Sequence, residues 1–212
     1  MQNASLGSQS TVAERVAQRA LADRSAAYED EVRRMLDAGL AVIRRCGTGS
    51  RPRVADIVAE AGLSNDAFYR HFASKDALIT ALLEDGTETL CSYLEHQLAK
   101  EPSAQGQVRC WLETVMSQAA GDVAATTRAV LWNAGTVGAG MAAGRHFSTA
   151  ALAALLVAPF ALLGSTDAAH DATLVAHAVM GTLADHLWAG TCPTAEERDR
   201  LLSFCLAVVS RP

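Results

Sequence analysis

Residues 54–78, VADIVAEAGLSNDAFYRHFASKDAL, decide how the N-terminal part of this chain folds. Apolar residues at helical spacing predict a first short helix over about 54–61. Gly62 can end that helix, because glycine readily adopts the left-handed conformation found just after helix C-termini. Ser64 is a favourable N-cap for a second short helix over about 65–71. Two short helices joined by a tight turn form a helix–turn–helix, whose second helix can enter a DNA major groove.

Three aromatic residues lie within five positions of this second helix, in a chain of which only 5% is aromatic. Phe68 and Phe72 are four residues apart and share one face, which we expect to anchor the helix in a small core. Tyr69 is turned by about 100° and can face outward. With His71 and Lys75 it offers hydrogen-bond donors suited to phosphate oxygens. On shape alone, a packed helical hairpin that does not bind DNA fits equally well.

The composition favours an all-helical protein with two unlike parts. The chain has 212 residues, 50% of them hydrophobic, and only five prolines. Its net charge of −5 excludes a chain that is basic throughout. Residues 1–75 contain 11 Lys and Arg against 9 Asp and Glu, whereas residues 76–212 contain 7 against 14. This division predicts a mildly basic module attached to an acidic body.

Helical periodicity extends over most of the chain, which predicts about nine helices in all. Besides the two short helices, the expected segments are about 26–46, a Ser74-capped helix ending before Pro102, 104–119, 123–134, 141–163, 167–189 and 194–209. The last begins with a capping box, Thr194 to Glu197. We find no strand-like alternation, phosphate-binding loop, nucleophile elbow or metal-binding helix motif. The sequence therefore predicts no enzyme, no catalytic residues, no metal site and no cofactor.

The cysteines, the N-terminus and the most apolar run point to a cytoplasmic protein. The five cysteines contain no Cys-x-x-Cys pair and are expected to be free thiols in a reducing compartment. Residues 1–24 lack an apolar signal core, and we expect them to form a flexible extension. The run 150–164 is too short for a membrane span and contains Pro159, so we expect a buried helix there and no membrane partner.

The region from about Tyr28 to Leu83 resembles the DNA-binding domain of the tetracycline-repressor (TetR) family of bacterial regulators. That family typically shows an apolar-x-Asp-Ile-Ala helix, then Ala-Gly-Val-Ser, Leu-Tyr-x-His-Phe and Ser-Lys-x-x-Leu. Here the corresponding segments are 54–57, 61–64, 68–72 and 74–78. The resemblance implies an N-terminal three-helix DNA-binding domain, expected at 25–76, and a helical ligand-binding and dimerisation domain, expected at 77–212.

The resemblance also implies which side chains meet DNA. Tyr69, His71 and Lys75 should contact phosphates, whereas Asn65, Asp66 and Ala67 should face base edges. Asp66 departs from the family pattern, and its carboxylate opposes phosphate unless it accepts from a cytosine amine. Arg53 stands where a Ser or Thr cap is usual, so Arg53 and Arg51 either grip phosphate or occupy an exposed loop. Ala55 and Ser64 complete the expected DNA-binding set.

The acidic body should enclose an apolar ligand site, as the resemblance implies. The candidate lining residues are dispersed over several helices: Leu94, Trp111, Val115, Met116, Trp132, Met141, Phe147, Phe160, His177 and Met180. Taken singly, each of them is expected in the ordinary core, but as a set several should line the site. The low aromatic content favours an aliphatic or acyl effector over a flat polyaromatic one. His170, His177 and His186 do not share a metal-binding spacing.

The last two expected helices should form a homodimer interface. Ala178, Gly181 and Ala184 are small and permit close helix crossing, and the final helix supplies apolar surface for an intermolecular four-helix bundle. Burial within one chain is the alternative for this surface. The sequence therefore predicts a dimeric transcriptional repressor that binds a palindromic operator and is released by a small hydrophobic effector. The alternative is an all-helical small-molecule-binding protein or enzyme with a non-functional helix–turn–helix.

Overall fold

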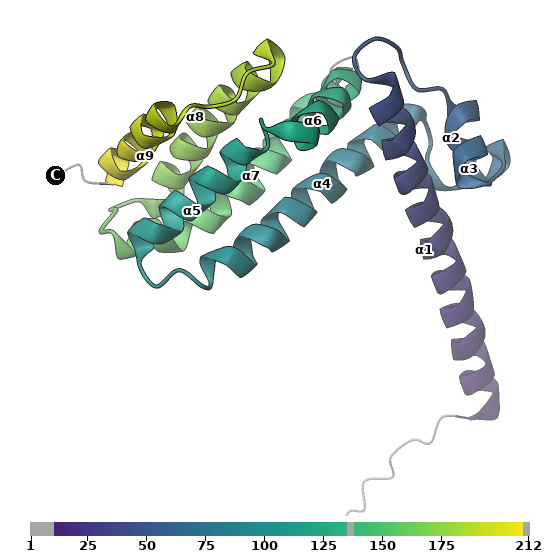
Figure 1. Ribbon diagram of the computed structural model, residues 1–212. Helices are drawn as coiled ribbons and strands as arrows, with labels where there is room; N and C mark the ends of the chain where they lie inside the picture. The colour runs from purple at the N-terminus through teal and green to yellow at the C-terminus, as the bar shows by residue number, and fades with distance from the viewer. Residues whose placement is uncertain (1–10, 135–137, 210–212) are drawn as a thin grey trace, which may run out of the picture.

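The computed structural model of the protein describes residues 11–134 and 138–209, with side chains described from 148 onward in the second range. Over these residues the chain is all-α, which confirms the expected fold class (Figure 1). The helices are α1 Val12–Cys46, α2 Val54–Ala61, α3 Asn65–His71, α4 Lys75–Leu98, α5 Ala104–Ser117, α6 Gly121–Ala134, α7 Gly138–Leu162, α8 Ala168–Ala189 and α9 Ala195–Val209.

The helices form two hydrophobic cores that meet along α4. The N-terminal core joins α1, α2 and α3 to the first two turns of α4, and Met35, Ile57, Phe68 and Leu78 are fully buried in it. The core of the body joins the last turns of α4 to α5, α7, α8 and α9. α4 therefore belongs to both cores, and Figure 1 shows it running from α1 into the body.

α6 is a second connection between the two cores. Ala129, Val130 and Ala134 of α6 are buried in the N-terminal core, although the helix lies in the second half of the sequence. The Nε of Arg44 in α1 donates a hydrogen bond to Thr126 Oγ1 at 2.8 Å. The core of the N-terminal domain thus includes residues beyond 76, the boundary expected from the sequence.

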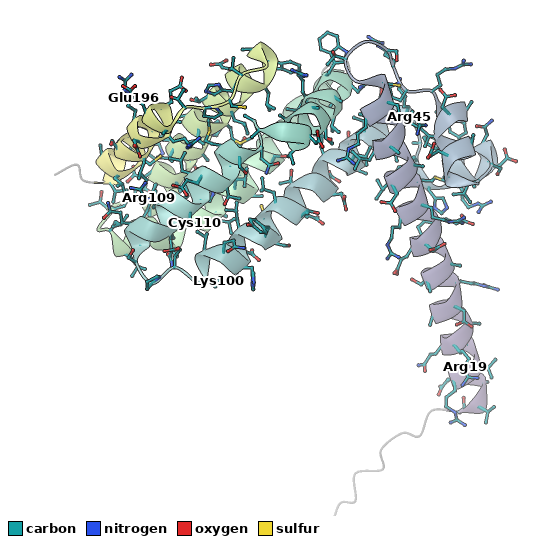
Figure 2. All side chains as sticks on the ribbon, viewed as in Figure 1. Arg19, Arg45, Lys100, Arg109, Cys110 and Glu196 are labelled. Carbon is teal, nitrogen blue, oxygen red and sulfur yellow. The ribbon has the colours of Figure 1, made fainter. Side chains whose placement is uncertain are left out.

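The first turns of α1 differ from the expected flexible extension over residues 1–24. Residues 1–10 lie outside the described residues, but Val12 to Arg24 are helical. Thr11 and Glu14 form a reciprocal capping box that supplies partners for exposed backbone N–H groups. Residues 11–30 are exposed, so local capping and an alanine-rich composition hold this segment rather than a core. Figures 1 and 2 show these turns, with Arg19 among them, projecting beyond α2 and α3.

The most apolar run forms the second half of α7, which packs against α8. Leu152, Leu156 and Phe160 of this run are buried in the core of the body. Pro159 lies inside α7 one turn before its end, where it removes a hydrogen bond but does not stop the helix at once. Among the helices of the described residues, none combines the length and hydrophobicity that crossing a membrane requires.

Candidate nucleic-acid interface

The turn between α2 and α3 has the geometry that the sequence predicted. Gly62 takes the left-handed conformation, with φ 64° and ψ 35°, and the N–H of Leu63 donates to the carbonyl of Val58 at 2.9 Å. Ser64 Oγ then accepts from the N–H of Ala67 at 3.1 Å and caps α3. A short helix that is capped at its N-terminus can present its first residues outward on a rigid support.

The buried face of α3 anchors it to the N-terminal core and leaves its first turn exposed. Phe68 and Phe72 are buried, as predicted, and Tyr69 projects outward with 59% of its surface exposed. Asn65 and Asp66 are exposed at the start of the helix. Asp66 also lies in the first turn of α3, where a carboxylate stabilises the positive end of the helix dipole.

Ala67 and His71 do not lie where the sequence reading placed them. Ala67 is 5% exposed and its methyl group packs into the core, so its side chain cannot face a base edge. The side chain of His71 is fully buried, and its Nε2 lies 2.6 Å from Glu31 Oε2 of α1. Helical spacing explains both corrections, because Ala67 and His71 fall on the same face of α3 as Phe68 and Phe72.

The remaining DNA-binding candidates are exposed or partly exposed on the segments that precede and follow α3. Arg51 and Arg53 are exposed in the loop before α2, and Arg53 makes no side-chain cap for that helix. Ala55 is exposed on the first turn of α2. Lys75 is partly exposed as the first residue of α4, next to the capping residue Ser74. Ser64 is exposed as well, although its hydroxyl oxygen already caps α3.

The sequence analysis did not assign Arg70 and Glu31 to the interface. Arg70 exposes 59% of its side chain beside Tyr69, and its Nη1 lies 3.3 Å from Glu31 Oε2. The hydrogen bond from His71, with Arg70 nearby, holds the pKa of the Glu31 carboxyl below its ordinary value. Arg70 could have been found as the cation between Tyr69 and His71, but its partner Glu31 lies 39 residues earlier.

The candidate ligand-binding residues do not share one wall. Leu94, Trp111, Val115, Met116 and Phe160 are buried in the core of the body, where the indole N–H of Trp111 donates to the carbonyl of Leu152 at 3.0 Å. Trp132 and His177 are exposed and Met180 is half-buried. The side chains of Met141 and Phe147 lie outside the described residues.

Two hollows among the described residues are lined by residues other than the ligand-binding candidates. One, of about 110 Å³, lies between α5 and α9 and is lined partly by Arg109, Glu113, Arg198 and Asp199. The other lies between α1 and α2, where Arg45 and Glu60 form an ion pair at 2.8 Å. Both have several charged lining residues, which does not suit the small apolar effector expected from the sequence.

α8 has an exposed stripe on the side away from the core. Leu174, His177, Gly181 and Trp188 follow helical spacing along it, and a Cβ built on Gly181 would meet nothing within 4 Å. Trp188 packs edge-to-face on Trp132 of α6 with ring centroids 6.2 Å apart. Phe204 of α9 is also exposed. The stripe is therefore a half-apolar surface that no other part of the described chain covers at Gly181.

Comparison with known proteins identifies the N-terminal domain. Residues 36–82 match the family model of bacterial regulatory proteins of the tetR family. This match confirms, for the DNA-binding domain, the resemblance found in the sequence. A sequence search finds no match among curated proteins.

Solved structures share the fold over most of the chain. A proposed TetR-family transcriptional regulator from Mesorhizobium loti MAFF303099 has a TM-score of 0.63 and 15% identity, covering 86% of this chain and 94% of that one. FadR from Bacillus subtilis, in complex with stearoyl-CoA, has a TM-score of 0.57 and 15% identity, covering 83% and 94%. RolR, in complex with resorcinol, has a TM-score of 0.62 and 14% identity, covering 89% and 97%. At these identities the likeness shows a common fold.

Proposed function

Because residues 36–82 match the model of the tetR family of bacterial regulatory proteins, we propose that the protein is a ligand-responsive transcriptional repressor that binds a palindromic operator as a homodimer. The observation that carries this proposal is α3. It is short, capped by Ser64 and anchored by Phe68, and it exposes Asn65, Asp66 and Tyr69 together on a rigid support. A recognition helix needs this arrangement, since its first residues must reach base edges.

The proposed contacts divide into those that read sequence and those that position the domain. Asn65 can pair with adenine through its amide, and Asp66 can accept from a cytosine amine. Tyr69, Lys75 and the loop arginines before α2 supply donors to phosphates on either side of the groove.

A dimer is proposed through α8 and α9. The exposed stripe of α8 and Phe204 of α9 are the apolar surfaces that remain open on these helices. Two copies of such a hairpin would bury them in a four-helix bundle. A two-fold dimer would then present two α3 helices to the two halves of a palindromic site.

The proposed effector is an apolar or acyl molecule that enters between α4, α5 and α7. The buried residues there are mainly aliphatic, with Met116 and Trp111, and methionine adapts readily to different ligands. The chain has three tryptophans, and Trp111 alone is buried, whereas Trp132 and Trp188 are about half-exposed. A Trp132→Phe/Trp188→Phe variant would therefore report only from the body core. An effector that enters this core should quench or shift the remaining emission.

The function is tested by binding to the DNA upstream of the protein's own gene over a salt series. A repressor should bind this DNA more tightly than an unrelated duplex of the same length, and its affinity should fall steeply with salt. Acyl compounds that change Trp111 emission should release the DNA over the same concentration range. Binding of such compounds by a protein with no affinity for any duplex would instead establish a small-molecule-binding protein with a non-functional helix–turn–helix.

A further inference from the structure

The last turn of α3 is tied to α1 through one carboxylate. Glu31 Oε2 lies 2.6 Å from His71 Nε2 and 3.3 Å from Arg70 Nη1, and these two donors are consecutive residues of α3. The Tyr28 ring, one turn earlier in α1, meets the His71 ring edge-to-face with centroids 4.3 Å apart. The recognition helix is thus fixed at both ends, by Ser64 at its start and by Glu31 at its finish.

The burial of His71 defines the hydrogen-bonding role of its ring. Its side chain is fully buried, and Nδ1 has no hydrogen-bond partner. Because a carboxylate can only accept a hydrogen bond, Nε2 carries the hydrogen and donates it to Glu31 Oε2. A buried polar ring with a single partner makes that partner important, since losing Glu31 would leave both ring nitrogens unsatisfied. His71 therefore helps to hold α3 against α1, and its side chain does not contact DNA.

Unlike the buried His71, Arg70 has an exposed side chain with donors that can still form hydrogen bonds. Its guanidinium has five N–H donors in a planar fork, and the contact with Glu31 engages Nη1 on the exposed side of the helix. Tyr69, the adjacent residue, is equally exposed. A guanidinium held by a carboxylate on one side can bind a phosphate with its remaining donors. Because the carboxylate already restricts the arginine side chain, less conformational entropy is lost when the phosphate binds.

We propose that Arg70 is a phosphate-binding residue of α3 and that Glu31 positions both Arg70 and the recognition helix. This inference rests on the proposed function, because it assigns residues to the same DNA interface. It also predicts an effect of removing Glu31 on DNA binding that differs from the effect expected from its charge alone. A carboxylate near DNA repels phosphate, so its removal should strengthen binding to every duplex alike. A positioning carboxylate should instead be needed for the difference between operator and unrelated DNA.

The test measures binding of the full-length protein to its own upstream DNA and to an unrelated duplex of equal length, each over a salt series. Arg70→Ala should weaken binding to both duplexes and make the salt slope shallower by about one. Arg109→Ala is the matched control, because Arg109 is an exposed arginine of α5 paired with Glu113 at 3.8 Å, and Figure 2 places it in the body, far from the N-terminal domain. It should leave the slope unchanged.

Glu31→Ala should lower the preference for upstream over unrelated DNA by about tenfold, the loss expected for one misplaced base contact. Asp30→Ala removes the same charge one residue earlier in α1 and should leave that preference intact. Glu31→Gln should also retain most of the preference, because an amide oxygen can still accept from His71 Nε2. Circular dichroism would show whether Glu31→Ala is still folded. If it is not, the preference kept by Glu31→Gln still tests the role of the hydrogen bond.

Three outcomes would overturn the inference. An unchanged salt slope in Arg70→Ala, with a reduced slope in Lys75→Ala, would remove Arg70 from the interface while leaving the proposed function intact. An equal change on both duplexes in Glu31→Ala and Asp30→Ala would reduce Glu31 to a general charge effect. If the unmodified protein binds neither duplex, the proposed function fails and this inference fails with it.

Discussion

Two side chains at the start of α3 combine exposure with groups that can read bases. Asn65 presents an amide and Asp66 a carboxylate, and both lie next to the Ser64 cap. Phosphate-binding candidates lie further along, at Tyr69 and at Lys75. These two sets should respond differently to substitution, because base contacts carry sequence information and phosphate contacts do not.

Asn65→Ala should cost about 1–3 kcal/mol on the operator and little on unrelated DNA, since it removes a base contact. Lys75→Ala should weaken binding to all duplexes alike and reduce the salt slope by about one, since it removes a phosphate contact. Tyr69→Phe should also act uniformly, through its lost hydroxyl donor. Competition binding over a salt series measures all three. Operator binding that stays unchanged in every variant would mean that α3 does not enter the groove.

At the residue level, the sequence predicted what depends on local spacing. Gly62 and Ser64 act on their immediate neighbours, and Phe68 and Phe72 lie four residues apart, so each was placed correctly. His71 was placed wrongly because its partners, Tyr28 and Glu31, lie about 40 residues away in the chain. Helical spacing places His71 on the same buried face as Phe68 and Phe72, but the resemblance to the family assigned it to phosphate contact instead.

Among the elements, α8 carries the main unexplained surface. Its exposed stripe contains Gly181, and a side chain added there meets no other part of the same chain. A larger residue at this position should therefore leave the monomer folded. Only a partner helix that crosses close to α8 would be disturbed by it.

Gly181→Leu should shift the protein from dimer toward monomer and lower its affinity for a palindromic operator, because a monomer holds one half-site. Gly86→Leu is the matched control. Gly86 is also an exposed glycine within a helix, with nothing within 4 Å of a built Cβ, but it lies on α4. Sedimentation velocity should show more monomer for the first variant alone. An equal dimer content in both would place the interface away from this part of α8.

α1 contains an exposed half and a buried half within one continuous helix. Residues 11–30 are exposed, and Met35 is the first fully buried residue. The sequence predicted the second half from its apolar periodicity. It did not predict the first, because capping and alanine content stabilise a helix without producing a buried face.

Deletion of residues 1–24 should leave the melting temperature nearly unchanged, since the deleted turns bury little against the domain. Deletion of residues 1–31 should lower it by several degrees, because it also removes Tyr28 and Glu31 from α3. Thermal unfolding followed by circular dichroism measures both. A large loss of stability in the shorter deletion would show that the exposed turns contact the rest of the protein.

For the whole molecule, the relation between the two cores matters most. α4 is buried in the N-terminal core through Leu78 and Leu82 and in the body through Leu94 and Leu98. Between them lies Gly86, and next to it Thr87 Oγ1 lies 2.8 Å from Ser148 Oγ of α7. A change in the position of α7 can therefore act on α4 beside its one glycine.

The expected ligand site was the least predictable feature of the molecule. Trp111, Val115 and Phe160 were expected either in the core of the body or along a ligand site, and the structure shows that they are buried. Periodicity cannot distinguish a side chain packed against its neighbours from one that lines a cavity, because both face the same core. Trp132 was expected in the same set of core or ligand-site residues, whereas it is about half-exposed and packs on Trp188 at the surface.

The two α3 helices of a dimer can occupy successive major grooves only at a spacing of about 34–36 Å. An effector that moves α7 and bends α4 at Gly86 would change this spacing. Glycine within a helix costs about 1 kcal/mol relative to alanine, so Gly86→Ala should stiffen α4. The variant should bind the operator as before but release it less completely when effector is added.

The measurement is operator release across a series of acyl compounds, with saturation confirmed by Trp111 emission. Near-complete release requires the effector to prefer the DNA-incompetent state by about 5.5 kcal/mol, so a stabilisation of about 1 kcal/mol should leave measurable residual binding. Gly181→Ala is the control, since it makes the same change at another open helical glycine without touching α4. Full release from Gly86→Ala at saturating effector would mean that the signal does not pass through a bend in α4. It would then have to pass through α6, which is buried in the N-terminal core at Ala129 and Val130.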